Sequence, residues 1–273
     1  RIVGGTGTIT LSHSGTITGS TFGLVLGGAQ GGTINSIIGT GTGYVQKRGA
    51  GTWTLTGNNT YSGNTTFYDD SGLGTLAISN SNALGSSAVT VSSGATLSLT
   101  GNNMTVTNSI TLNGTGFSTG GALRNVSGNN TYQGAITLGA DTRINSDSGT
   151  LTLDVASGNG ITGTFNLTFG GSGNLIVSDP IATSTGTLTK DGSGTLTLSA
   201  TNTYTGSTTI SAGTIAVTTN DGLGTNGSGT TIGASGTLDI QGVNYSTTEG
   251  LTVNGGTIKT STGTSTFAGA ISL

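Results

Sequence analysis

Two stretches decide the fold: GTWTLTGNNTYSG at residues 51–63 and GTLTLSATNTYTG at residues 194–206. They align with an offset of 143, which matches Leu55 to Leu198 and Tyr61 to Tyr204. Self-similarity at a fixed offset is typical of repeat proteins, in which each unit buries its apolar face against its neighbours. The repeated phrase therefore predicts a repeat architecture, and the same offset should recur elsewhere in the chain.

The repetition extends along nearly the whole chain. Residues 121–138 align with 256–273, residues 7–11 with 149–153, and the pair Arg1, Ile2 with Arg143, Ile144. We therefore expect one continuous domain over residues 1–273, built from long repeats 1–142 and 143–273. Within each long repeat, a shorter pattern T-[YF]-x-G marks two half-units, each of about three coils; its aromatic residues are Tyr61, Tyr132, Tyr204 and Phe267.

Short alternations of apolar and hydroxyl residues predict the secondary structure. Examples are TWTL at 52–55, AVTV at 88–91 and TLTL at 150–153, bounded by Gly, Asn or Ser. Such period-2 runs indicate strands, and no window has helical periodicity. Combined with the repeats, they predict an all-β fold: a parallel β-helix (β-solenoid) of roughly twelve coils with no helical domain. Leu, Ile, Val and Phe should point inward, and Thr and Ser outward.

The repeated phrase assigns structural roles to its own residues. Leu55 and Leu198 should fill the core, and residues 59–61 should turn a corner, where stacked Asn side chains can bond along the stack. The recurrent aromatic residues favour a ladder packed under a corner, and Trp53 takes the core position of Leu196. The structural markers are thus Tyr61, Tyr132, Tyr204, Phe267, Trp53, Leu196, Asn59, Asn130 and Asn202.

Composition argues against several classes of function. Only seven Lys and Arg occur in 273 residues, the net charge is −3, and there is no cysteine. Without a basic stripe, binding to nucleic acid or to an anionic membrane surface is not expected. Without cysteine, disulfides, zinc ribbons and thiol catalysis are excluded. The sequence has no run of 18 or more apolar residues, so no membrane-inserted segment is expected. The N-terminus RIVGG has no signal-peptide pattern, and we therefore expect a processed chain or a fragment.

Catalytic alternatives are weak. RIVGG together with DSG at 147–149 invites a trypsin-like interpretation, but His13 is the only histidine and lies in a strand-end or loop segment. A catalytic triad needs a base held by an orienting acid, which no local pattern supplies. We predict no catalytic residues and no enzyme activity.

The acidic residues do not form a recognisable site either. Asp69 and Asp70 are adjacent and belong to an inserted loop, and Glu249 stands alone. GGSGNLIV at 170–177 is similar to a calcium-binding nonapeptide, but Asn174 replaces its aspartate, and Asp221 is isolated. Structural turns explain both segments better than a weak cation site, so no metal or cofactor is expected.

Residues 192–217, GSGTLTLSATNTYTGSTTISAGTIAV, closely resemble the passenger-associated transport repeat of bacterial autotransporters. The similarity extends to residue 240, and a second cassette runs from Gly49 to about Leu99, with Trp53 in place of the usual Leu. Together the cassettes cover more than a third of the chain. The resemblance implies a right-handed β-helix, exported to the surface of a Gram-negative-type bacterium. It also implies a C-terminal membrane barrel, which in the parent protein would lie outside this sequence.

The expected function is therefore a non-enzymatic extracellular segment of an adhesin, stalk or filament. Both ends stop within the repeating pattern without a cap, so we expect further copies of the repeat or head-to-tail stacking of chains. The alternatives are a glycan-binding module that uses its aromatic residues or its Thr and Asn face, and a polysaccharide-degrading enzyme with converging carboxylates. The threonine columns are too interrupted to indicate ice binding.

Overall fold

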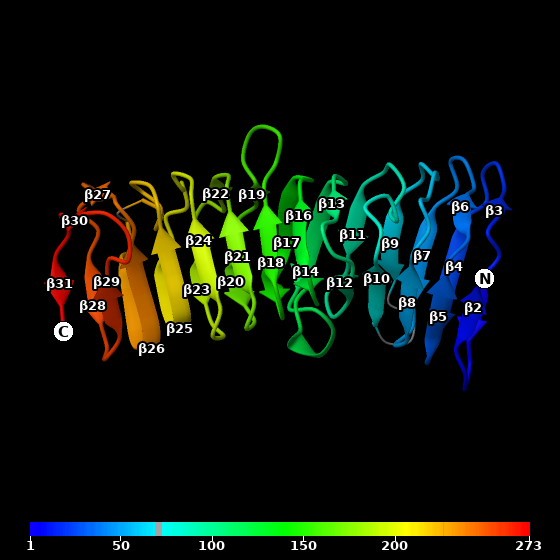
Figure 1. Ribbon diagram of the computed structural model, residues 1–273, viewed down its shortest axis with the longest axis horizontal. Helices are drawn as coiled ribbons and strands as arrows, with labels where there is room; N and C mark the ends of the chain where they lie inside the picture. Colours follow the sequence, from blue (N-terminus) through cyan, green and yellow to red (C-terminus); the bar gives the residue numbers. More distant parts are fainter. Residues whose placement is uncertain (69–72, 226) are drawn as a thin grey trace.

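The computed structural model describes residues 1–68, 73–225 and 227–273, and these form a parallel β-solenoid whose turns stack into a rod (Figure 1). Every strand pair in the described residues is parallel, and successive partners lie one turn apart in the sequence. Within the described residues the first face contains 13 strands, close to the predicted twelve coils. The handedness stays a prediction.

Each turn of the solenoid has three faces. The first face is formed by β2 (Ile9–Leu11), β5 (Gly31–Ile34), β8 (Thr52–Leu55), β10 (Thr75–Ile78), β12 (Thr96–Leu99), β15 (Leu123–Asn125), the end of β17 (Ile136–Ser146), β20 (Leu167–Gly170), β23 (Leu188–Lys190), the starts of β25 (Thr208–Val217) and β26 (Thr230–Ile240), β28 (Leu251–Val253) and β31 (Ile271–Ser272).

The other two faces follow the first around each turn. The second comprises β3 (Thr16–Thr18), β6 (Ile37–Gly39), β13 (Thr105–Val106), β16 (Asn129–Tyr132), β18 (Thr150–Leu153), β21 (Asn174–Val177), β24 (Thr195–Leu198), the ends of β25 and β26, and β29 (Thr257–Lys259). The third comprises β1 (Ile2–Gly4), β4 (Leu24–Gly28), β7 (Val45–Arg48), β9 (Thr65–Tyr68), β11 (Val89–Val91), β14 (Ile110–Gly114), the start of β17, β19 (Ile161–Thr162), β22 (Ile181–Ala182), β27 (Asn244–Tyr245) and β30 (Thr266–Phe267).

The described residues contain one helical element, the short 3₁₀ turn η1 (Phe117–Thr119). No helix in this described part of the chain has the length and apolar character needed to cross a bilayer. The predicted all-β fold without a helical domain is confirmed for these residues.

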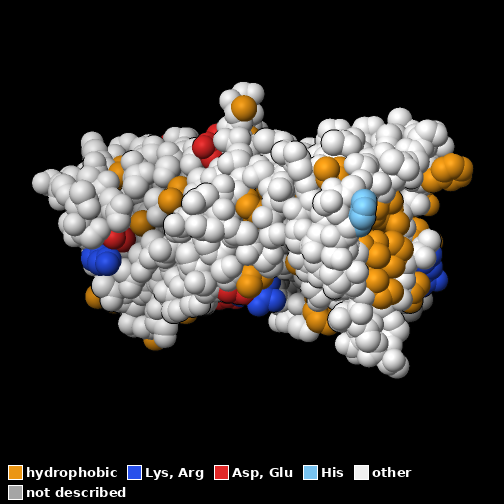
Figure 2. Space-filling view, turned by 45° about the vertical axis from the view of Figure 1, so that its right-hand side comes forward, with side chains coloured by type: hydrophobic (Ala, Val, Ile, Leu, Met, Phe, Trp, Pro, Cys, Tyr) orange, Lys and Arg blue, Asp and Glu red, His pale blue; other side chains and the backbone are white. Residues whose placement is uncertain are grey.

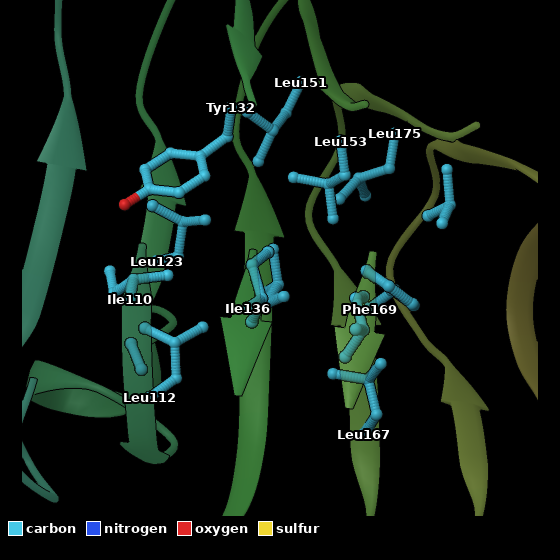
Figure 3. Packing of buried hydrophobic residues seen from close by; sticks show 14 of the residues in the cluster. Ile110, Leu112, Leu123, Tyr132, Ile136, Leu151, Leu153, Leu167, Phe169 and Leu175 are labelled. Atoms are coloured by element: carbon cyan, nitrogen blue, oxygen red, sulfur yellow. The ribbon is translucent and has the colours of Figure 1, made fainter. Parts of the chain in front are cut away.

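The core is a continuous stack of inward side chains. On the third face, for example, Ile110 lies beside Ile136, and Leu112 lies beside Leu138. Figure 3 shows the labelled members of this stack, gathered in the interior from successive turns; they include Ile110, Leu112, Ile136, Leu123 and Tyr132. The inward and outward alternation departs from prediction at some hydroxyl positions, because Thr65 and Thr208 are buried. Their hydroxyl groups bond to tyrosines inside the solenoid.

The 143-residue offset does not correspond to a whole number of turns. Trp53 lies on the first face, and following its register partners through six turns leads to Lys190, six residues before Leu196. The partners are Leu76, Leu97, Leu123, Ile144, Phe169 and Lys190. Leu196 lies on the second face, in β24. Aligned residues of the two long repeats therefore occupy neighbouring faces, which corresponds to six turns and one third.

The segment 59–61 is also more than a corner. The Thr60 amide donates to the Ile38 carbonyl of β6 at 2.9 Å, so residues 59–61 continue the second face. In the aligned segment, the Thr203 amide donates to the Ile181 carbonyl at 3.0 Å, which places residues 202–204 on the third face. The prediction of a corner was thus incomplete. In each of the two segments the extended backbone takes the place of a strand and bonds to the strand of the preceding turn.

Candidate functional site

The trypsin-like features lie in ordinary solenoid positions. Ile2 is in β1 and stands opposite Leu26. His13 Nδ1 accepts a hydrogen bond from the Gly15 amide at 2.8 Å, and its carbonyl accepts one from the Ser36 hydroxyl at 2.7 Å. Both interactions stabilise a turn, so this histidine has a local structural role.

Among the described residues there is no group of three or more His, Cys, Asp or Glu side chains that could hold a metal ion. Asn174 accepts a hydrogen bond from the Thr195 amide at 3.1 Å. Asp221 has a left-handed backbone (φ 59°) and accepts from the Thr247 hydroxyl. Asp69 and Asp70 lie outside the described residues.

A buried lysine closes one turn in each cassette. Lys47 Nζ donates to the carbonyls of Arg48 (3.0 Å) and Gly49 (2.5 Å), and the side chain is 1% exposed. Gly49 has a φ of 69°, a left-handed conformation that glycine adopts without strain. This conformation brings the carbonyls around the ammonium group, so the charge is solvated by backbone oxygens rather than by water.

Lys190 repeats the arrangement in the second cassette. Its Nζ donates to the carbonyls of Asp191 (2.7 Å) and Gly192 (2.8 Å), and Gly192 has a φ of 73°. Burial lowers the pKa of both lysines to about 8; for Lys190, nearby Asp191 partly opposes this shift and Arg143 adds to it. The two lysines are 143 residues apart, as the repeat requires.

The marker asparagines bridge three successive turns. Asn59 Oδ1 accepts from the Ile38 amide of the preceding turn (2.7 Å), and Nδ2 donates to the Ala83 carbonyl of the next (2.6 Å). Asn202 makes the same two bonds, to the Ile181 amide (2.8 Å) and the Gly222 carbonyl (2.6 Å). Each buried amide thus replaces ladder hydrogen bonds where regular strand pairing stops.

Asn130 performs part of this role on the second face. Its Oδ1 accepts from the Met104 amide at 2.9 Å, and its Nδ2 donates to the Gly101 carbonyl at 3.0 Å. It also bonds to Asn125 Oδ1 at 2.7 Å, so a short network replaces the single bridge to the next turn.

The marker tyrosines are buried and hydrogen-bonded. Tyr61 pairs with the Thr65 hydroxyl at 2.7 Å, and Tyr204 pairs with the Thr208 hydroxyl at 2.8 Å, four residues ahead in both cases. Tyr132 donates instead to the Asn108 carbonyl at 2.8 Å. Burial raises the pKa of all three hydroxyls far above the ordinary value. Phe267 is partly buried and stacks on Tyr245 with a centroid distance of 5.4 Å.

Glu249 occupies the hydroxyl position of this pair near the C-terminal end. Tyr245 donates to Glu249 Oε2 at 3.2 Å, and the Thr230 hydroxyl donates to Oε1. The side chain is 1% exposed. Burial raises the pKa of Glu249 to about 7, although the bonds from Thr230 and Tyr245 act in the opposite direction; Asp221 adds to the increase.

Two segments that contain this geometry match the model of a known repeat family. The model of the passenger-associated-transport-repeat matches residues 45–68 and 188–217. Over these two segments the chain is similar to the passenger-associated transport repeat. Both matched segments begin two residues before a buried lysine and include the lysine turn, the asparagine bridge and the tyrosine pair. Repeats and solenoid together fit the β-helix repeat domain of an autotransporter passenger. No curated protein and no solved structure matched the chain.

The sequence pattern contained a signal for the lysines that was missed. K-x-G-x-G-T occurs at 47–52 and 190–195 and overlaps the start of the two repeated stretches from which the fold was predicted. In both strands the lysine falls two residues after a buried apolar residue, Val45 or Leu188, and so at an inward position. Trp53 and Leu196 are both fully buried, although on different faces.

Proposed function

We propose that this chain is a non-enzymatic structural segment of an extracellular bacterial protein, a stalk, filament or adhesin passenger whose contribution is length and rigidity. The observation that carries the proposal is the parallel pairing of 13 described first-face strands in a chain with two segments similar to the passenger-associated transport repeat. The family of the repeat supports a location at the surface of a Gram-negative bacterium.

The buried polar groups support a structural role over a catalytic one. Lys47 and Lys190 direct their ammonium groups to backbone carbonyls of their own turns. Glu249 accepts from a threonine and a tyrosine hydroxyl inside the solenoid. Groups held in this way stabilise the coil and are shielded from any substrate in solution.

The location can be tested on intact cells of the bacterium that produces the protein. An antibody raised against the folded chain should label unpermeabilised cells, and protease added outside should remove the label. Labelling that requires permeabilisation would contradict the proposal. An antibody to a periplasmic protein serves as the control for cell integrity.

Glycan binding is the second candidate, and two exposed aromatic residues favour it. Tyr44 and Tyr68 lie on the third face with 45% and 51% of their surface exposed, and the Arg48 guanidinium stands 4.4 Å from the Tyr68 ring centre. Trp53 and Tyr132 are fully buried and so cannot stack on a glycan. A glycan array that shows binding by the wild type and none by the Tyr44→Ala, Tyr68→Ala variant would support this alternative.

A further inference from the structure

Two tyrosines mark a patch on the third face of the solenoid. Tyr44 directly precedes β7, and Tyr68 ends β9; Figure 1 shows β4, β7 and β9 side by side. Each of these three strands has a paired strand on both sides, in the order β1, β4, β7, β9, β11. The patch therefore lies on the side of the rod, and its exposure does not depend on where the rod begins or ends.

The Tyr44 ring lies flat on the backbone of Gly23. A methyl group at Gly23 would stand 2.3, 2.4 and 2.5 Å from the ring atoms Cζ, Cε1 and Cε2. Only a point above the face of the ring is so nearly equidistant from these three atoms. The ring thus occupies the space that a side chain of residue 23 would take. Tyr44 is still 45% exposed, so the other face of its ring is open to solvent.

The side chains between the two tyrosines are neutral and polar. Gln46 and Thr66 stand opposite each other in the register of β7 and β9. Gln46 Oε1 accepts a hydrogen bond from Arg48 Nε at 2.7 Å, which turns the Gln46 Nε2 amide away from the arginine as a donor. The Arg48 guanidinium in turn packs on the Tyr68 ring. The patch therefore has an aromatic ring at each end, with amide and hydroxyl groups between them.

The spacing of the rings limits the size of a ligand that contacts both. Tyr44 and Arg48 are four residues apart along one extended segment, and Tyr68 stands beside Arg48 in register. Four residues of extended chain cover about 13 Å, a length that about three or four pyranose rings span. A pyranose with equatorial substituents presents an apolar C–H face that stacks on an aromatic ring, while the hydroxyl groups at its rim bond to amides and hydroxyls.

Other kinds of partner fit this patch less well. A peptide that binds as an added strand needs a free backbone edge, and β7 has a neighbour on both sides. A strongly charged polymer needs a surface of complementary charge. The chain has only seven Lys and Arg and ten Asp and Glu, and Figure 2 shows charged side chains few and scattered on the side of the rod that it draws. A neutral sugar needs neither a free edge nor a charged surface.

We propose that this patch binds a neutral oligosaccharide of about three or four pyranose rings, with one ring stacked on Tyr44 and another against Tyr68. Gln46 and Thr66 bond to hydroxyl groups of the rings between them. The sugar chain runs along β7, across the axis of the rod. Gly23 is a positioning residue, because its missing side chain lets the Tyr44 ring lie flat. The inference rests on the glycan-binding candidate and adds the site and the class of sugar.

Calorimetric titration of the 273-residue chain with cellotetraose and with chitotetraose tests the inference. We expect at least one of the two to bind. Tyr44→Ala should weaken this binding about tenfold, whereas Tyr44→Phe, which keeps the ring, should change it less than about twofold. Unchanged circular dichroism spectra serve as evidence that the variants fold.

Gly23→Ala should weaken binding as much as Tyr44→Ala does. The new methyl group displaces the ring, and the flexible Tyr44 side chain can move without disturbing the strand. Gly250→Ala is the matched control, because a methyl group there meets nothing within 4 Å. If Gly23→Ala alters the circular dichroism spectrum, the comparison of Tyr44→Ala with Tyr44→Phe decides instead.

Several results would overturn the inference. They are no binding of either neutral sugar, equal binding by Gly23→Ala and Gly250→Ala when both are folded, equal losses in Tyr44→Ala and Tyr44→Phe, and tighter binding of an acidic hyaluronan tetrasaccharide than of both neutral sugars. Binding that survives every substitution would leave the glycan-binding candidate standing and show only that the site is wrong. Labelling of intact cells tests the surface location separately from all of these.

Discussion

At the scale of single residues, Glu249 departs most from the repeat. It takes the position held by Thr65 and Thr208 in the tyrosine pairs, but it brings an ionisable group to a site where it accepts hydrogen bonds from the neutral hydroxyls of Thr230 and Tyr245. Because folding raises its pKa from 4.5 to about 7, the folded state binds more protons than the unfolded state between these values. The contribution of Glu249 to stability is complete below pH 4.5 and is lost as the pH rises through 7.

The C-terminal turns should therefore loosen between pH 5 and pH 8. Linkage gives a change on the order of 3 kcal/mol in the local free energy of opening. Amide hydrogen exchange of residues 230–253, measured as protection rather than as raw rate, should show this change in the wild type. Glu249→Gln, which stays uncharged, should abolish it. A pH dependence of equal size in both proteins would show that another group is responsible.

A second prediction concerns the lysine turns. Lys190→Met keeps most of the side-chain volume but removes the donor to the Asp191 and Gly192 carbonyls. We expect the local free energy of unfolding to fall by about 1–3 kcal/mol. The two buried carbonyls lose their hydrogen-bond donor, and this cost exceeds the gain from no longer burying a charge. Hydrogen exchange of residues 188–217 should report it. Lys259→Met, at a half-exposed lysine, should change protection by less than about 0.5 kcal/mol.

The residue scale also marks a limit of prediction from sequence. Period-2 alternation placed Leu55 and Leu198 in the core, where both are fully buried. The same alternation places Lys47 and Lys190 inward, but a charged side chain is normally expected to face water. Only the turn geometry, with Gly49 and Gly192 in the left-handed region, supplies the carbonyl oxygens that make burial acceptable.

At the scale of one element, the N-T-Y segment acts as a backbone substitute for a strand. The side-chain amide of Asn202 connects the turns before and after it. The Tyr204 hydroxyl bonds to the Thr208 hydroxyl and so ties this segment to the start of the next strand. The sequence indicated stacked asparagines, but it could not indicate that they bond to backbone groups of neighbouring turns. That outcome depends on strands ending at the same level in three successive turns.

Asn202→Ala tests the role of the asparagine through one hydrogen bond. The Ile181 amide donates to Asn202 Oδ1 and should lose most of its protection from exchange, with a local cost of about 1–3 kcal/mol. Tyr204→Phe removes only a hydroxyl pair and should cost about 1 kcal/mol. Asn174→Ala, at an exposed asparagine, is the matched control. Full protection of the Ile181 amide in Asn202→Ala would contradict the assigned role.

At the scale of the whole molecule, the repeat and the turn have different periods. On the first face, six turns of 21 to 26 residues each lead from Trp53 to Lys190. The long repeat of 143 residues is longer than these six turns by one further face. Alignment of the sequence identified the repeat but not this rotation, because turn lengths vary with the loops between strands. A solenoid tolerates the rotation, since each turn needs only apolar side chains beneath it and a free edge to pair.

A pair of deletions tests most directly whether the chain is a solenoid whose length depends on its number of turns. Removing residues 168–208 deletes two whole turns, because Thr168, Thr189 and Thr209 stand in register. Removing residues 168–198 deletes a fractional number of turns and joins strands of different faces.

Small-angle X-ray scattering of the two variants and the wild type is the measurement. The two-turn deletion should stay folded and give a rod shorter by about 10 Å, at roughly 4.8 Å per turn, whereas the fractional deletion should lose its compact scattering profile. Two deletions that behave alike, or a folded two-turn deletion with an unchanged maximum dimension, would contradict the account.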